Sequence, residues 1–130
     1  MNETSQFRLT GTWELRSIVD INKAGEAVGY PMGERPIGLL IYQRDGHMAV
    51  NITTFDATAH VQSMWYAGTW SADETSVTHV IRVAPQQDWI GSRQKRVLEV
   101  VSRDHIQLLG AGPRSPHSVR RLEWGRVVSK

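Results

Sequence analysis

The chain of 130 residues contains no cysteine, which excludes disulfides and thiolate chemistry. It has no apolar run long enough for a membrane-spanning helix, and no phosphate loop, dinucleotide fingerprint or Gly-x-Ser-x-Gly elbow. Its 5 histidines do not have metal-ligand spacing, so we expect neither a metal site nor a cofactor. The polar first residues are unlike a signal peptide, which favours a cytoplasmic protein that does not contact a membrane.

Net charge is also small, at +2, but it is unevenly distributed. Residues 1–90 carry 6 Lys and Arg against 10 Asp and Glu, whereas residues 91–130 carry 9 against 3. A basic third of a chain can attract an anionic ligand or a nucleic acid. Here the basic residues alternate with apolar ones, as on solvated strand faces, and no nucleic-acid motif is present. We therefore expect no nucleic-acid partner.

What the chain does have is a series of short apolar runs separated by turn residues. In the first run, residues 9–20, Trp13 and Leu15 share one face and Glu14 and Arg16 the other. This period of two predicts a half-buried strand whose Trp13 closes one end of a barrel. Arg126 is expected to pair with this region and stack on Trp13. Further strands are predicted at 38–43, 47–53, 65–71, 77–83, 93–101, 105–109 and 118–127.

These runs predict an all-β fold in one domain, residues 1–130. A closed antiparallel up-and-down barrel of about eight strands leaves no exposed sheet edge, and an open sandwich is the alternative. The segment 55–64 lacks alternation and is predicted to form a short helix or lid. The Asp45-Gly46 pair predicts a hairpin, and a two-residue loop would place Tyr42 opposite Ala49. Periodicity does not decide which face of this hairpin, residues 38–53, points inward.

Several polar side chains fall on the predicted inner face. His79 alternates with Val77 and Ile81, and Gln94 and Arg96 share a face with Leu98 and Val100, while Lys95 and Glu99 face away. Burying such groups is costly unless they are paired with each other, with water or with a ligand. A satisfied structural network is one interpretation, and a ligand site is the other. The catalytic candidates are His79, Arg96, Tyr42 and Tyr66. The ligand-binding candidates are Gln94, Trp65, Trp70, Trp89, Leu40, Ile81 and Leu98, although such tryptophans more often serve packing.

Several short motifs, in order along almost the whole chain, resemble those of the small lipocalin-like domain family, single-domain microbial and fungal barrels. They are Leu9-x-Gly11-Thr12-Trp13-x-Leu15, Pro36-x-Gly38-x-Leu40-Ile41-Tyr42, Asp45-Gly46-x-Met48, Tyr66-x-Gly68-x-Trp70, Val77-Thr78-His79, Trp89-x-Gly91-x-x-x-x-Arg96 and Leu122-x-Trp124-x-Arg126. The resemblance implies a lipocalin-like barrel with a central cavity for a small apolar or amphipathic molecule. Related barrels include pure binders as well as isomerases and cyclases of natural-product pathways.

The sequence therefore leaves two functions open. The first is binding of a small hydrophobic or amphipathic molecule, such as a natural-product intermediate, by a monomer or homodimer. An anionic or carbonyl oxygen of that ligand is one candidate partner for Arg96. The alternative is a cofactor-independent isomerase or cyclase. In that enzyme His79 or a tyrosine would move a proton, and Arg96 and Gln94 would stabilise negative charge on an oxygen.

Overall fold

A computed structural model describes residues 8–111 and 119–128 of the chain. Within these ranges the chain forms strands joined by turns and one short 3₁₀ helix, η1. The elements are β1 (Gly11–Ile21), β2 (Ala27–Gly29), β3 (Ile37–Tyr42), β4 (His47–Thr53), β5 (Ser63–Ala72), β6 (Ser76–Val83), η1 (Gln87–Trp89), β7 (Arg93–Ser102), β8 (His105–Ala111) and β9 (Val119–Arg126). No helix in the described ranges has the length and apolarity needed to cross a bilayer.

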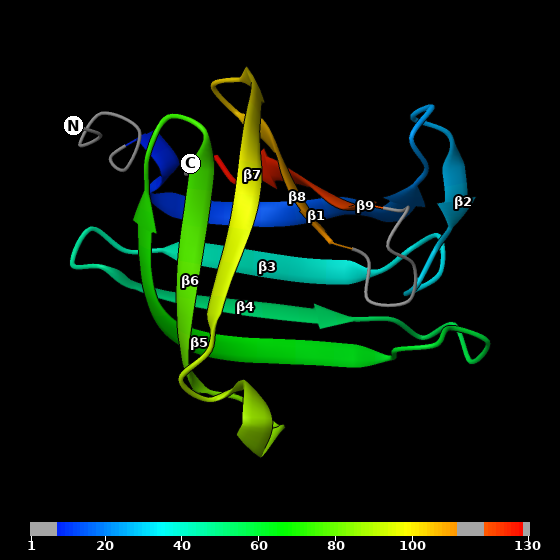
Figure 1. Cartoon of the computed structure of the whole chain (residues 1–130), viewed down its shortest axis with the longest axis horizontal. Coiled ribbons are helices and arrows are strands. Elements are labelled where there is room, and N and C mark those ends of the chain that lie inside the picture. The colour runs from blue at the N-terminus through cyan, green and yellow to red at the C-terminus, as the bar shows by residue number, and fades with distance from the viewer. Residues whose placement is uncertain (1–7, 112–118, 129–130) are drawn as a thin grey trace.

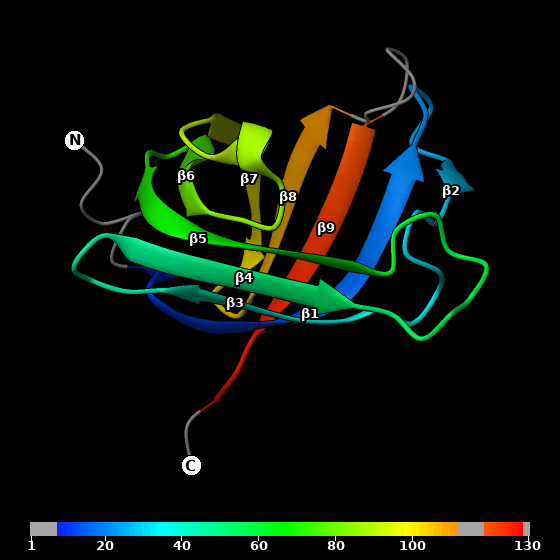
Figure 2. The ribbon, with the colours of Figure 1, turned by 90° about the horizontal axis from the view of Figure 1, so that it is seen from below.

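The strands form a closed antiparallel barrel, which confirms the predicted fold (Figure 1). The sheet runs in the order β2-β1-β3-β4-β5-β6-β7-β8-β9, and pairing of β1 with β9 closes it. Figure 2 shows β3, β4 and β5 crossing over β8, β9 and β1, with the interior between these two layers. The short β2, which the sequence analysis did not predict, pairs only with the end of β1 and lies outside the eight-stranded ring.

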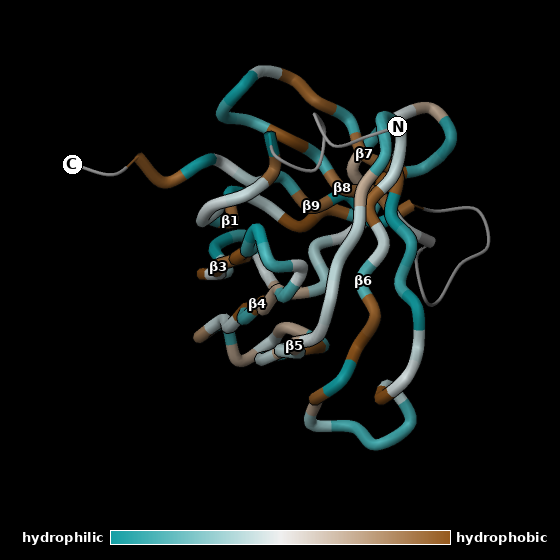
Figure 3. The backbone as a smooth tube through the Cα atoms, turned by 90° about the vertical axis from the view of Figure 1, so that its left-hand side faces the viewer, coloured by the Kyte–Doolittle hydropathy of each residue, from teal (hydrophilic) through white to brown (hydrophobic). Residues whose placement is uncertain are grey.

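Alternation of polar and apolar residues along the strands decides which side chains face the interior. Figure 3 shows hydrophilic and hydrophobic residues alternating along the backbone. In β3, Leu40 and Tyr42 are 1 % exposed, whereas Leu39 is 44 % exposed. The Tyr42 face of the hairpin therefore points inward. The hairpin does not have a two-residue loop. Tyr42 pairs with Met48, and a three-residue turn connects β3 to β4. Gly46 lies at φ +94 in this turn, a conformation that glycine adopts without steric cost.

Of the short helix or lid predicted for 55–64, the helix is wrong, because residues 55–62 form turns and irregular structure and residues 63–64 begin β5. The Asp56 carboxylate accepts hydrogen bonds from the Thr58 amide and hydroxyl, at 2.9 and 2.6 Å. Such a local side-chain bond competes with helical hydrogen bonding. The same two bonds lower the pKa of Asp56. The 3₁₀ turn lies instead between β6 and β7, where it carries Trp89.

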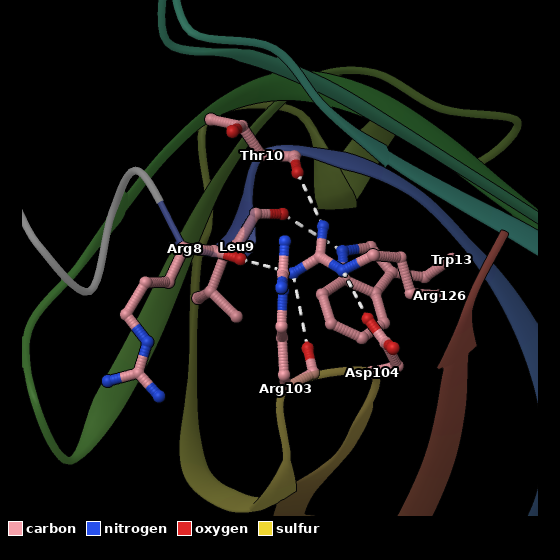
Figure 4. Close-up of polar contacts among 7 residues, drawn as sticks. All are labelled: Arg8, Leu9, Thr10, Trp13, Arg103, Asp104 and Arg126. Atoms are coloured by element: carbon pink, nitrogen blue, oxygen red, sulfur yellow. Dashed lines mark hydrogen bonds and ion pairs between the residues drawn. The ribbon is translucent and has the colours of Figure 1, made fainter. Parts of the chain in front are cut away.

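Trp13 closes the base of the barrel, as predicted (Figure 4). Its side chain is 0 % exposed, and its Nε1 donates to the Leu9 carbonyl at 2.9 Å. The Arg126 guanidinium carbon lies 4.3 Å from the centre of the indole ring. The same guanidinium donates to the Thr10 carbonyl at 2.8 Å and pairs with Asp104 at 3.2 Å. Arg126 therefore seals the base by stacking and by tying neighbouring loops together.

Candidate ligand-binding site

His79 lies in the barrel interior between two tyrosines from other strands. The Tyr42 hydroxyl is 2.6 Å from Nε2 of His79, and the Tyr66 hydroxyl is 2.6 Å from Nδ1. Tyr42 comes from β3, Tyr66 from β5 and His79 from β6, and all three are buried. The barrel thus brings together three of the four predicted catalytic side chains in one continuous hydrogen-bonded chain.

Burial keeps this cluster electrically neutral. Burial, together with the nearby Arg96 charge, lowers the pKa of His79 to about 3. Burial also raises the pKa of Tyr66 to about 12 and raises that of Tyr42 well above its usual value. A neutral imidazole carries one N–H, so it donates to one tyrosine and accepts from the other. The accepting tyrosine keeps its own hydroxyl proton, which it can donate to a further oxygen.

Aromatic rings support the cluster on both sides. Tyr42 packs against Trp70 with ring centres 4.4 Å apart, and Trp70 donates its indole N–H to the Gln43 carbonyl at 2.9 Å. Tyr66 meets Trp89 edge to face at 6.5 Å. Trp89 is partly buried against the core from the β6–β7 connection. These contacts fix the two phenol rings and place Trp89 beside Tyr66.

Gln94 and Arg96 lie on the inner face of β7, next to β6. His79 pairs with Gln94, and Val77 pairs with Arg96. Arg96 donates to the Gln94 side-chain oxygen and to the Lys95 carbonyl, both at 3.3 Å. Both side chains are half-buried, and no described carboxylate lies within ion-pair distance of Arg96. The guanidinium is therefore a cation on the inner wall without a protein counter-charge among the described residues.

The remaining predicted site residues divide into core and surface. Leu40, Ile81 and Leu98 belong to the buried core. Trp65 is 38 % exposed, and alternation with buried Tyr66 places it on the outer face of β5, away from the cluster. Val100, predicted to lie inside, is 47 % exposed near the base end of β7.

The interior differs between its two ends. We call the Trp13 end the base, and we call the opposite end, where β1, β4, β6 and β8 finish, the mouth. A small space of about 20 Å³, room for about one water molecule, lies at the base beside Trp13, Leu98 and Ile106. Towards the mouth, Met64, Trp89 and Leu122 pack against the core but are only partly buried. Three of the apolar side chains that are only partly buried against the core therefore lie towards the mouth.

A second inward arginine, Arg120, was not predicted from the sequence. Arg120 of β9 shares a face with core residue Trp124, and it holds Asp20 through two bonds of 2.9 and 3.1 Å. Alternation from Trp124 would have placed Arg120 inside. The inward position of Asp20 could not be predicted from the sequence, because a bulge between Leu15 and Ser17 shifts the inner face of β1 by one residue.

The described residues offer no metal site, because no three His, Asp or Glu side chains gather there as ligands would. Three arginines of the basic third take part in ion pairs: Arg120 with Asp20, Arg121 with Glu123, and Arg126 with Asp104. Arg96 differs from these three because it has no such partner within residues 8–111 and 119–128.

The motifs at the start of the barrel have a counterpart among known families. Residues 10–65 match the lipocalin-like domain family. The match runs from the start of β1 into β5 and confirms the resemblance predicted from the sequence. No curated protein matches the chain.

Two solved structures resemble this barrel along almost its whole length. One is a redesigned β-barrel, with a TM-score of 0.52 and 14 % identity over 95 % of each chain. The other is a de novo designed fluorescence-activating β-barrel, with a TM-score of 0.49 and 14 % identity over 95 % of this chain and 97 % of that one. The first of these likenesses supports the fold alone.

Proposed function

We propose that the protein binds a small amphipathic molecule in the mouth-side half of its barrel. The observation that carries this proposal is Arg96, a half-buried inward cation without a described carboxylate partner. Removing a charge from water is costly unless hydrogen bonds and a counter-charge replace the hydration. A carbonyl or anionic oxygen of a ligand would supply such a partner at Arg96.

The apolar part of the ligand would lie against the partly buried side chains near the mouth. Met64, Trp89 and Leu122 come from three separate parts of the wall and pack on one core. A pocket with apolar walls and a few convergent polar groups is the usual form of a small-molecule site. The lipocalin-like barrel supports ligand binding in general, and the polar groups supply orientation.

Titration with Nile red, a neutral apolar fluorophore, tests this location. Leu122→Trp enlarges a half-buried side chain on the inner face of β9. The matched control is Leu109→Trp, on the neighbouring β8, where alternation with buried Leu108 points the side chain outward. We expect Leu122→Trp to weaken dye binding at least tenfold, about 1.4 kcal/mol, and Leu109→Trp to leave it unchanged.

Circular dichroism must show that both variants keep the wild-type spectrum. Equal affinity in all three proteins would place the dye outside the barrel and contradict the proposed site. Absence of dye binding to the wild type would count against small-molecule binding itself.

A second candidate function is a cofactor-independent isomerase or cyclase. The observation that favours it is the Tyr42–His79–Tyr66 chain, with both hydroxyls 2.6 Å from a neutral imidazole. If Tyr42 donates to Nε2, the Nδ1–H of His79 donates to Tyr66, whose own proton remains available for a substrate oxygen. Arg96 and Gln94 would then stabilise negative charge that develops on that oxygen.

Exchange of the acidic α-protons of a diketone in deuterated water, followed by NMR, tests this candidate. An enzyme using this imidazole should accelerate the exchange, and His79→Phe should lose roughly two to four orders of magnitude in rate while largely retaining diketone binding. A pure binder would accelerate nothing, and His79→Phe would change only the affinity, modestly.

A further inference from the structure

Four residues form a row across the inner wall at the mouth. Asp20 of β1 pairs with Arg120 of β9, Arg120 pairs with Gly110 of β8, and the β7–β8 register places Arg96 opposite Gly110. Each shares its face with core residues of its own strand, such as Leu98 for Arg96 and Leu108 for Gly110. Two arginines therefore flank one glycine on the same face of the sheet.

The charges in this row do not cancel. Asp20 binds Arg120 through both carboxylate oxygens, so this pair is neutral and geometrically satisfied. Arg96 makes two bonds of 3.3 Å to uncharged oxygens and none to a described carboxylate. One positive charge on the inner wall is thus left without a counter-charge within the described chain.

Gly110 provides the surface on which the Arg96 guanidinium lies. A Cβ at position 110 would come within 2.9 Å of Cδ, 3.0 Å of Nε and 3.1 Å of Nη1 of Arg96. The φ of Gly110 lies outside the left-handed region, so the backbone does not require glycine there. What the missing side chain provides is space for Arg96.

A chain of hydrogen bonds holds the other side of Arg96. The Gln94 oxygen accepts from Arg96, and the Gln94 amide nitrogen donates to the Ser92 hydroxyl at 3.2 Å. The Ser92 hydroxyl in turn donates to the Trp89 carbonyl at 2.6 Å. The guanidinium is therefore held in place between β8 and the turn that carries Trp89. A planar, oriented guanidinium is suited to a carboxylate, which it can bind through two parallel bonds.

We propose that Gly110 positions Arg96 to anchor the single carboxylate of an amphipathic monocarboxylic acid at the mouth of the barrel. This inference rests on the proposed ligand-binding function and adds the charge class of the ligand. One carboxylate neutralises the Arg96 guanidinium, which has no carboxylate partner among the described residues, and the apolar body extends towards Leu122 and the core. Gly110 is a positioning residue, because it acts only through Arg96.

The test compares a medium-chain fatty acid carrying a fluorophore with its methyl ester, which has the same body without the charge. The wild type should bind the acid at least tenfold more tightly than the ester. Arg96→Met, which retains most of the side-chain volume, should reduce that preference to less than about twofold, because it weakens binding of the charged acid far more than binding of the ester. Gly110→Ala should also reduce it several-fold, because the added methyl displaces the guanidinium.

The matched control is Gly125→Ala. There an added Cβ would displace the guanidinium of Arg16, which comes within 2.6 Å at Nη2, and Arg16 is exposed. This variant should retain the wild-type preference for the acid. The ratio of acid to ester affinity is the decisive readout, because a variant that only disturbs the barrel weakens both probes together.

The outcomes separate the two proposals. Equal binding of acid and ester by the wild type would overturn the carboxylate anchor while leaving small-molecule binding intact. Failure of both probes to bind would count against the proposed function itself. An unchanged acid preference in Arg96→Met would overturn the role of Arg96. An unchanged preference in a folded Gly110→Ala would overturn the positioning role of the glycine.

Discussion

At the scale of single residues, His79 is in an environment that disfavours its charged form. Both ring nitrogens contact a tyrosine hydroxyl at 2.6 Å, and burial lowers the pKa to about 3. A protonated imidazole would donate from both nitrogens, which would force both hydroxyls to act as acceptors. The neutral ring accepts one phenol proton and donates one of its own. The folded structure therefore depends on His79 remaining uncharged.

The pH dependence of the free energy of unfolding should reveal that His79 is uncharged in the folded protein. Between pH 6.5 and about 3 the unfolded chain protonates His79 while the folded chain does not. The free energy of unfolding is therefore largest above about pH 6.5 and falls as pH decreases through this window, with a slope of up to about 1.4 kcal/mol per pH unit from this residue. Denaturant unfolding at several pH values, wild type against His79→Gln, measures that contribution as a difference.

His47→Gln provides the control, because the His47 side chain is 60 % exposed. Its imidazole makes only an exposed ion pair with Asp45, at 3.2 Å, so its curve should depart from that of the wild type much less than the His79→Gln curve does. A His79→Gln curve parallel to that of the wild type would show that His79 protonates equally in both states, contrary to the environment described above.

The sequence predicted the inward position of His79 but not its two partners. Alternation with Val77 and Ile81 fixed the face of β6, because those aliphatic neighbours are unambiguous. Tyr42 and Tyr66 were candidates, yet the Tyr42 hairpin is apolar on both faces, and its turn allowed two registers. Only closure of the barrel brings β3 against β6. Gly110 gave no sequence signal, since its role depends on a side chain from the neighbouring strand.

At the scale of elements, turn residues marked most strand boundaries, and the misses have physical causes. The strand β2 has three residues, too short for alternation to register, and only the end of β1 pairs with it. The bulge in β1 adds Arg16 to the strand, and no glycine marks that position in the sequence. The inward position of Asp20 could therefore not be inferred. Residues 112–118, which include the first residue of the predicted strand 118–127, lie outside the described residues.

A register shift between β5 and β6, where Ala67 pairs with Val83 and Gly68 with Ile81, leads to a prediction about strand pairing. A Cβ at position 68 would lie 1.8 Å from the Val80 carbonyl oxygen of β6, which is backbone and cannot rotate away. Gly68→Ala should therefore lower the free energy of unfolding by about 1–3 kcal/mol or more, as overpacking does.

Gly110→Ala is the informative comparison for this measurement. Its methyl meets the flexible end of Arg96 rather than backbone, so the loss should be below about 1 kcal/mol. Denaturant titration of both variants gives the two values. Similar losses would mean that β5 and β6 are not as close at Gly68 as described.

At the scale of the whole molecule, the large aromatic side chains and the polar row occupy different ends of the barrel. Trp13, Tyr42, Trp70 and Trp124 fill much of the base-side interior. The polar row and the partly buried apolar residues lie towards the mouth. Arg120, Arg121 and Arg126 each pair with an acidic group, which leaves less free positive charge for a nucleic acid than composition suggests. That expectation of no nucleic-acid partner stays a prediction.

The most direct test of the central claim, that a small molecule binds in the mouth-side half of the barrel, is a two-dimensional amide NMR titration with the fluorophore-labelled fatty acid. We expect the largest shifts at inward residues near the mouth, namely Gln94, Arg96, Gly110 and Leu122. Shifts confined to the exposed outer face of β3 and β5, at Leu39 and Trp65, would contradict it.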